Sequence, residues 1–378
     1  MSSPLLLVFW SLWFFNFSSR TVLSPLLPLF EHELNITHTL AGSVFFFASL
    51  GYTLSLLISG WLSLRIGFKK SIIAGVSLLA VALFCLTFAS SYSQLGLFVT
   101  VVGFAAGIYL PSAIPLLTSA IRPEKWGKAI AFHDTAASFS ILAIPLVAAA
   151  ILRFFEWKVI LYILCAGCFA VCLAFSILSP DPRQKDTARL GFLQILKRKE
   201  FWIMAILWVF ASGSTLGLYN ITPLFLLSEK KISLETANTI LGLSRFGGFI
   251  ATFLAGFLAD RYGVKRVLLS SVAITGASTV GIALVDSFPL LVAALVAQAT
   301  VSTVFFPVGL VAISKITALN ERSLFTGATV AFSMTFGNGA IPFLLCAVAD
   351  AWSFQAGIFF LGVLTTLSCA VVRRLPKI

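Results

Sequence analysis

The sequence predicts an all-α integral membrane protein with 12 transmembrane helices arranged as two six-helix repeats. Composition is the first observation, because 59% of the 378 residues are hydrophobic and only 11% are charged. Soluble domains carry about 25% charged residues. The second observation is a series of apolar runs, each about as long as the 20 residues that cross a bilayer as a helix. The third is a repeat that relates the two halves of the chain.

The apolar runs follow one another with short connections. One longer polar stretch, 181–200, separates an N-terminal six-helix bundle (1–180) from a C-terminal one (201–378). We expect 181–200 to be a cytoplasmic linker. The predicted spans are 5–30, 40–62, 70–90, 94–118, 129–151, 157–178, 201–227, 236–258, 266–285, 288–314, 325–348 and 352–372.

The distribution of positive charge predicts the orientation. With the N-terminus in the cytoplasm, 20 of the 26 Lys and Arg residues fall on the cytoplasmic side and 4 on the outer side. This bias follows the positive-inside rule, so we expect both termini to be cytoplasmic. The net charge of +12 is then explained by the orientation of the chain in the membrane, and no nucleic-acid partner is expected. The absence of long tails favours a plasma (inner) membrane, whose lipid bilayer is the main partner.

The internal repeat is clearest after the second and eighth runs. GWLSLRIGFKK and GFLADRYGVKR lie 196 residues apart, and Pro111 matches Pro307 at the same offset. Two six-helix halves joined by a loop are typical of transporters that bind their substrate at the bilayer midplane. The coinciding loop positions are Gly60 and Gly256, Arg65 and Arg261, and Gly67 and Gly263.

These loops resemble the loop motif of the major facilitator superfamily, and the resemblance covers the whole chain. The motif runs Gly, three residues, Asp, a basic residue, one residue, Gly, then basic residues. The second copy matches it with Asp260, whereas Leu64 replaces the acid in the first copy. The resemblance implies a secondary transporter that works by alternating access, usually as a monomer.

The resemblance also implies a latch on the cytoplasmic side. In the family the motif acid binds a helix N-terminus and a basic partner across the two halves. We expect Asp260 to do so, against the start of a neighbouring span or Lys315, whereas Leu64 cannot, so the gate is asymmetric. The alternative is that these loop charges only set topology.

Two arginines lie near the centre of predicted spans. Arg20 is in the first run and Arg245 in the eighth, and a central Arg costs about 2.5–3.5 kcal/mol even on lenient insertion scales. Of the 14 acidic residues only Asp134 lies clearly within a span. One acid cannot neutralise two arginines, so an anionic solute is the expected partner. The alternative is a structural role, with both guanidinium groups bonded to carbonyls at helix breaks.

Neighbouring residues extend this candidate substrate site. Helical spacing places Trp13 and Asn16 beside Arg20, and Asn238 beside Arg245. Tyr109 and Tyr219 come from spans expected to line the same cavity. Organic-anion porters of the family carry an Arg in the first span, and nitrate/nitrite porters carry one in the eighth. This chain resembles each branch only in part. The position related to Arg20 by the repeat is Leu216, and the position related to Arg245 is Ser49.

His133 and Asp134 are the only adjacent ionisable pair inside a span, and they are candidates for proton coupling. The alternative is a capping role near the start of span five. The three His residues are too scattered for a metal site, and no cofactor is expected. The sequence contains neither a phosphate-binding loop motif nor a metalloprotease motif, so we expect no ATP-driven transport and no enzyme activity.

The sequence therefore predicts a secondary active transporter of a small anionic solute, with His133 and Asp134 as candidates for coupling to protons. Two alternatives remain open. A multidrug or cation exporter of the same family would be expected to carry acidic residues in its central cavity, where Asp134 is the sole candidate. A transport-dead sensor on the same fold would need an additional signalling domain or tail.

Overall fold

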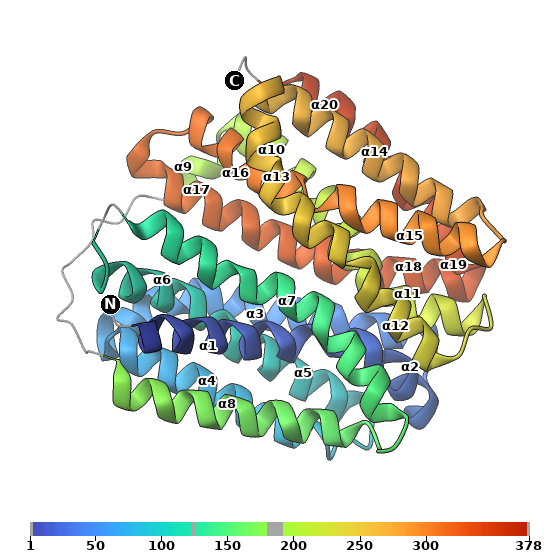
Figure 1. The fold of residues 1–378 in the computed structure, drawn as a ribbon, viewed down its shortest axis with the longest axis horizontal. Coiled ribbons are helices and arrows are strands. Elements are labelled where there is room, and N and C mark those ends of the chain that lie inside the picture. Colours follow the sequence, from blue (N-terminus) through green and yellow to red (C-terminus); the bar gives the residue numbers. More distant parts are fainter. Residues whose placement is uncertain (1–2, 123–124, 180–191, 376–378) are drawn as a thin grey trace.

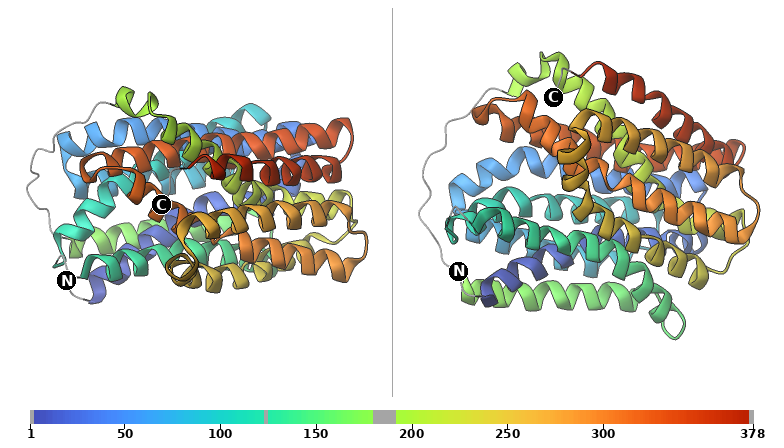
Figure 2. Two further views of the ribbon diagram at one scale, coloured as in Figure 1. Left: turned by 90° about the horizontal axis from the view of Figure 1, so that it is seen from above. Right: turned by 45° about the horizontal axis from the view of Figure 1, so that its top comes forward.

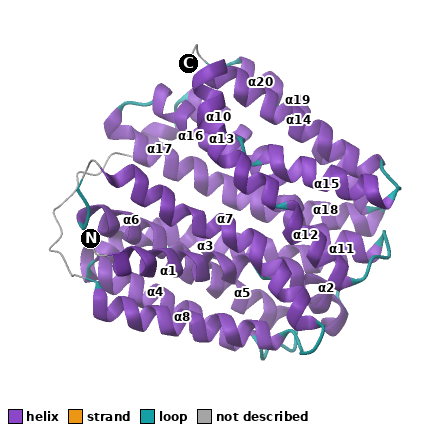
Figure 3. Cartoon of the chain, viewed as in Figure 1, coloured by secondary structure: helices purple, strands orange, loops and turns teal. Residues whose placement is uncertain are grey.

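A computed structural model describes residues 3–122, 125–179 and 192–375. Within these residues the chain forms helices and connecting turns and no strand (Figure 3). Twelve helical segments there are long and apolar enough to cross a membrane. This confirms the predicted fold class. Most of the predicted linker lies outside the described residues.

The N-terminal half occupies the blue-to-green part of Figure 1 and contributes six of these spans. Two of the six are interrupted and consist of two helices each. The helices are α1 (Ser3–Thr21) with α2 (Leu23–Leu34), α3 (His38–Ile66), α4 (Phe68–Leu86), α5 (Tyr92–Gly107) with α6 (Tyr109–Ser119), α7 (Trp126–Leu152) and α8 (Lys158–Leu178).

The C-terminal half follows the short helix α9 (Phe192–Leu196) and contributes the other six spans. Two of them contain a π-helical segment, labelled η. The helices are α10 (Lys199–Ser212), η2 (Gly213–Gly217) and α11 (Leu218–Ser228); α12 (Leu234–Ser244) with α13 (Phe246–Tyr262); α14 (Val264–Leu284); α15 (Phe288–Ser302) with α16 (Phe305–Ile316); α17 (Leu319–Phe332), η3 (Ser333–Ala340) and α18 (Ile341–Ala351); and α19 (Phe354–Leu367) with α20 (Cys369–Arg373).

Proline explains where several spans are interrupted. Proline has no N–H group, so the carbonyl four residues earlier loses its helical partner. α5 ends at Gly107, four residues before Pro111, and α15 gives way to α16 around Thr303, four residues before Pro307. The matching prolines of the repeat therefore produce matching breaks. The first span breaks at Val22, just before Pro25.

The repeated loop motif also has the same backbone in both copies. Gly67 separates α3 from α4 with φ of 90°, and Gly263 separates α13 from α14 with φ of 86°. Residues with a side chain rarely adopt this conformation, which explains the glycine at both positions. The basic residue two positions later attaches each turn to the end of the last span of its half, because Lys69 Nζ donates to Ser179 O and Lys265 Nζ donates to Leu375 O.

The two halves lie against each other, with the N-terminal half below the C-terminal half in Figure 1 and in the right view of Figure 2. The end of the molecule where α8 finishes and α10 begins is called the linker end, and the opposite end the far end. The main contacts between the halves join α2 to α11, α3 to α18 and η3, and α7 to α12. Of these segments, α2, α11, α12 and α18 lie between mid-molecule and the far end, so the halves are closed there.

Close helix packing inside the N-terminal half depends on small residues, as the Gly103 and Gly107 spacing suggests. A Cβ atom on Gly103 would lie 1.9 Å from the Ala48 carbonyl oxygen, and one on Gly107 would lie 2.0 Å from Ser55 Oγ. The main chains of α5 and α3 therefore touch at these positions.

Replacing Gly103 with Val should destabilise the protein severely, because neither backbone can move aside without repacking both spans. We expect a loss of about 3 kcal/mol or more, at the upper end of overpacking costs, read as a lower melting temperature in detergent. Gly281→Ala is the matched control, since a Cβ atom there meets nothing within 4 Å. Equal melting temperatures for the two variants would contradict the close approach of α3 and α5.

Candidate functional site

A cavity lies between the two halves at the depth of the helix breaks. In this state its volume is about 20 Å³. Arg20 is the only one of its lining residues that carries a formal charge. From the N-terminal half it is lined by Phe17, Arg20, Thr21, Leu23, Phe45, Ala48, Ser49 and Tyr52, and from the C-terminal half by Leu216, Tyr219, Asn220, Met334 and Asn338.

Arg20 occupies the wall of this cavity without a counter-ion among the described residues. Its guanidinium carbon lies 4.7 Å from the ring centre of Phe17 and 4.6 Å from that of Tyr52. Its Nε and Nη2 atoms are buried and have no hydrogen-bond partner in the described structure. Unpaired buried donors of a charged group are costly. The Arg20 guanidinium is therefore available to donate hydrogen bonds to a ligand in the cavity.

Arg245 is placed differently from Arg20. It lies at the junction of α12 and α13, is buried, and contacts Tyr219, with 5.1 Å between its guanidinium carbon and the ring centre. Arg245 does not line the cavity, whereas Tyr219 does. No acid pairs with Arg245 within the described residues. The structure thus places the second predicted arginine behind the aromatic ring that forms the cavity wall.

Tyr219 connects the two halves through carbonyls that prolines leave free. Pro223 removes the helical donor for the Tyr219 carbonyl, and Ser24 of the other half donates to that oxygen at 2.8 Å. Pro145 likewise removes the helical donor for the Ile141 carbonyl. The Tyr219 hydroxyl donates to that oxygen at 3.5 Å. Both interactions cross between the halves, so Tyr219 joins them at the floor of the cavity.

Three other predicted site residues form a stack inside the N-terminal half. Trp13 lies parallel to Tyr109 and to His133, with ring centres 5.6 Å and 5.7 Å apart. Tyr109 donates to the Phe9 carbonyl at 3.0 Å, and its oxygen lies 3.1 Å from His133 Nε2. The Trp13 ring centre is 6.0 Å from the Arg20 guanidinium. The stack supports Arg20 from behind and does not itself line the cavity.

The remaining predicted residues lie apart from the cavity. Asn16 is buried and donates to the Ala106 carbonyl at 3.0 Å, beside the break between α5 and α6. Asn238 is buried at the contact between the halves, with its amide 3.5 Å from the Pro25 carbonyl. Asp134 is exposed. The structure therefore gives Asn16 and Asn238 positions at helix breaks.

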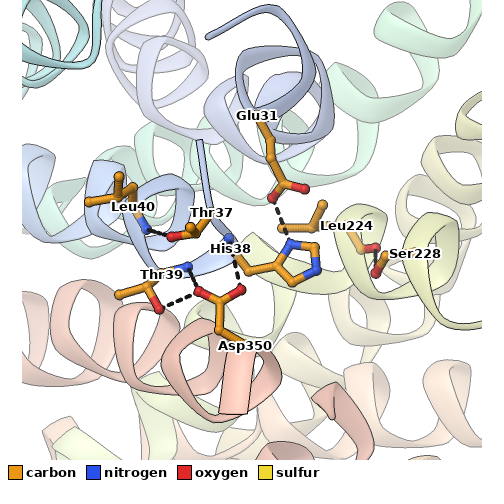
Figure 4. A network of polar contacts seen from close by, with 8 residues as sticks. All are labelled: Glu31, Thr37, His38, Thr39, Leu40, Leu224, Ser228 and Asp350. Atoms are coloured by element: carbon orange, nitrogen blue, oxygen red, sulfur yellow. Dashed lines mark hydrogen bonds and ion pairs between the residues drawn. The ribbon is translucent and has the colours of Figure 1, made fainter. Parts of the chain in front are cut away.

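A polar latch holds the halves together at the far end (Figure 4). Asp350, at the end of α18, accepts hydrogen bonds from the backbone N–H groups of His38 at 3.2 Å and Thr39 at 2.7 Å, and from the Thr39 hydroxyl at 2.6 Å. A carboxylate on a helix N-terminus is favourable, because the first N–H groups have no helical partner. His38 also bonds to Glu31 at 2.7 Å.

The predicted gating motif is open at the linker end. Asp260 is exposed and has no hydrogen bond or ion pair within the described residues, so the predicted latch, including the contact to Lys315, is not formed in this state. Arg65 lies over Trp61 at 4.6 Å, and Arg261 over Tyr262 at 5.4 Å. Asp350 thus joins the halves at the far end, while Asp260 at the linker end has no such partner among the described residues.

Several cavity residues are absent from the sequence-based site. Tyr52, Ser49 and Asn338 line the cavity, yet each lies in an apolar run without a neighbouring charge. Pro342, four residues after Asn338, is the one signal that marks an irregular helix at that depth. Leu216, the repeat-related partner of Arg20, lies on the opposite wall, which is the position that the repeat implies.

Comparison with known proteins gives the family. A model described as Major Facilitator Superfamily matches residues 9–248 and 214–377. An uncharacterized MFS-type transporter of Bacillus subtilis, YceJ, is 23% identical and covers 71% of this chain and 70% of its own length. The putative niacin/nicotinamide transporter NiaP of the same organism is 22% identical, covering 95% and 92%. The multidrug resistance protein MdtG of Proteus mirabilis is 23% identical, covering 94% and 91%.

Solved structures share the fold over nearly the whole chain. A D-xylose-proton symporter has a TM-score of 0.84 at 15% identity, covering 99% of this chain and 98% of its own. A bacterial homolog of the human lysosomal transporter Spinster, in an inward-facing and occupied conformation, has a TM-score of 0.83 at 16% identity, covering 99% and 97%. With the family model, the loop motif and the twelve spans in agreement, the chain belongs to the major facilitator superfamily.

Proposed function

We propose that this transporter moves a small organic anion across the membrane by alternating access, with Arg20 as the group that binds the anion. The observation that carries this proposal is the unpaired guanidinium in the cavity between the halves. All other lining residues are neutral, so the cavity has a positive wall and no acid to cancel it. A carboxylate or a similar anion supplies the missing acceptors.

The conformation fits one step of such a cycle. The halves are joined at the far end through Ser24, Tyr219 and Asp350, and the linker-end acid Asp260 is free. If the linker end is cytoplasmic, as the positive charges favour, this is an inward-facing state. We place both termini in the cytoplasm and the protein in the plasma (inner) membrane on the same grounds.

The relatives offer two kinds of substrate. The name of NiaP gives niacin as a substrate of that protein. Niacin is a small aromatic carboxylic acid, and a site with one guanidinium suits that chemistry. The relation to MdtG favours the alternative of a multidrug exporter, for which the aromatic lining is suitable. The absence of a carboxylate from the cavity lining argues against organic cations. His133 and Asp134 are our candidates for proton coupling, since His133 belongs to the stack behind Arg20 and Asp134 follows it in the chain.

Small anions should stabilise the wild-type protein against heat, and replacing Arg20 with Gln should remove the effect. At about 100 times its dissociation constant, a ligand adds roughly 2.7 kcal/mol to the free energy of unfolding. Loss of the charged partner should weaken binding at least 30-fold, since truncating one partner of a buried charge pair costs about 2 kcal/mol or more. The measurement is the melting temperature in detergent with nitrate, phosphate, sulfonates and mono- and dicarboxylates.

Arg65→Gln is the matched control, because Arg65 also lies over an aromatic ring in the same half but outside the cavity. It should keep the full response to the anion. Stabilisation by lipophilic cations and by no anion would instead support the exporter, and Arg20 would then be structural.

A further inference from the structure

The C-terminal wall of the cavity carries a pair of amide side chains that no function assigned above uses. Asn220 Nδ2 donates to Asn338 Oδ1 at 3.0 Å and lies 3.2 Å from the Asn338 main-chain oxygen. Both residues line the cavity. An amide pair joined in this way has one free acceptor, Asn220 Oδ1, and one free donor group, Asn338 Nδ2. No hydrogen bond to another described residue occupies these two groups.

The backbone around this pair is irregular. Asn220 follows the π-helical segment η2, and Asn338 lies inside η3. Such segments are rare and occur often at functional sites. Asn220 Nδ2 also bonds to the Asn338 main-chain oxygen within this segment. The pair is therefore held in place by the main chain as well as by its side chains.

The two walls of the cavity differ in charge. Arg20 and its unpaired Nε and Nη2 belong to the N-terminal half. The C-terminal wall, formed by Leu216, Tyr219, Asn220, Met334 and Asn338, carries no charge. Nε–H and Nη2–H lie on one edge of the guanidinium, the edge that binds a carboxylate through two parallel hydrogen bonds. A ligand spanning the cavity meets a cation at one end and neutral amides at the other.

Aromatic rings form part of the cavity lining. The rings of Phe17, Phe45, Tyr52 and Tyr219 line the cavity. Aromatic rings favour stacked or edge-to-face contact with another ring. A second negative charge on the ligand would be desolvated beside Asn220 and Asn338 without a cation to pair with it, which is unfavourable. The walls thus favour a flat ligand with one charge.

We propose that Asn220 and Asn338 form a second subsite that recognises a neutral hydrogen-bonding group on the substrate, so that the substrate class is a flat monocarboxylate with such a group opposite its carboxylate. This rests on the proposed function, since it takes Arg20 as the anion-binding group. Asn338 contributes specificity, and Asn220 positions it.

Three ligands with the same ring test this subsite. Benzoate, 4-carbamoylbenzoate and terephthalate carry, opposite one carboxylate, a hydrogen, a neutral amide and a second charge. Dissociation constants would be measured by calorimetry on the full-length protein in detergent. We expect 4-carbamoylbenzoate to bind about 3- to 10-fold more tightly than benzoate, the gain of one or two neutral hydrogen bonds. Terephthalate should bind more weakly than both.

The Asn338→Leu variant should lose the preference for 4-carbamoylbenzoate and keep the affinity for benzoate. Asn220 can still donate to the main-chain oxygen of residue 338 in that variant. The control is Thr335→Val in the same π-helical segment, whose hydroxyl contacts Thr53 at 2.8 Å and does not line the cavity. It should keep the preference.

Three results would overturn the subsite. They are a preference for the amide that survives in Asn338→Leu, tighter binding of terephthalate than of benzoate, and no binding of any of the three ligands. The proposed function is separable from these outcomes. It fails only when no anion in the wider screen gives a response that depends on Arg20.

Discussion

Replacing Ser24 with Ala should shift the protein away from the state in which the far end is closed. In that state the Ser24 hydroxyl is the partner of the Tyr219 carbonyl, which Pro223 has freed from its helix. Without Ser24 this buried oxygen has no donor among the described residues, which costs about 1–2 kcal/mol. When the far end opens, water can reach the carbonyl, so the cost falls on one state only. The ratio of the two states should change about 5- to 30-fold.

Spin labels at two exposed far-end positions would report this shift. Phe154 in the N-terminal half and Trp352 in the C-terminal half are each 75% exposed. The distance distribution between them should gain a longer component in Ser24→Ala. Ser228→Ala is the control, because the Ser228 hydroxyl donates to Leu224 in its own helix at 2.6 Å. An unchanged distribution in Ser24→Ala would show that this hydrogen bond does not hold the far end.

The substitutions Asp350→Asn and Asp260→Asn should act in opposite directions. Asp350 places its charge on the N-terminus of α3 and joins the halves at the far end, so its neutralisation should favour opening there. Asp260 is free in this state, and its predicted latch forms when the linker end closes. Its neutralisation should therefore favour the state observed here. Each shift should be about 1 kcal/mol, or roughly fivefold.

The same pair of labels measures both shifts against a neutral control. Asp286→Asn removes a charge that pairs with Lys230 at 3.0 Å within the C-terminal half. It should leave the distance distribution unchanged. Shifts of the same sign for Asp350→Asn and Asp260→Asn would refute the assignment of the two acids to opposite ends.

The spans were predictable because bilayer thickness sets their length and composition. All twelve were placed to within a few residues at most ends. The repeat paired Pro111 with Pro307, but the helix breaks there were not predicted. Which side chains point into the cavity was harder to predict. Arg20 was found because a charge in an apolar run stands out, whereas Tyr52 and Asn338 carry no such signal.

The placement of Arg245 shows why spacing alone was insufficient. A helical pattern assumes one continuous helix, and the eighth span turns at Arg245 itself, between α12 and α13. The break redirects its side chain onto Tyr219, away from the cavity. The far-end latch was missed for a related reason, since Asp350 and Thr39 are 311 residues apart and belong to different halves.

The two π-helical segments imply that the cavity walls tolerate change unequally. A π turn contains about one residue more than an α turn, so deleting one residue from η2 or η3 restores a regular helix. The helix on either side of the deletion keeps its facing, because the removed residue is the one that the π turn had accommodated. A single codon loss would thus change only the side chains that spans seven or eleven present within η2 or η3. In the α-helical wall that carries Arg20, a deletion rotates everything beyond it by about 100°, so selectivity can diversify on one side while anion binding is retained on the other.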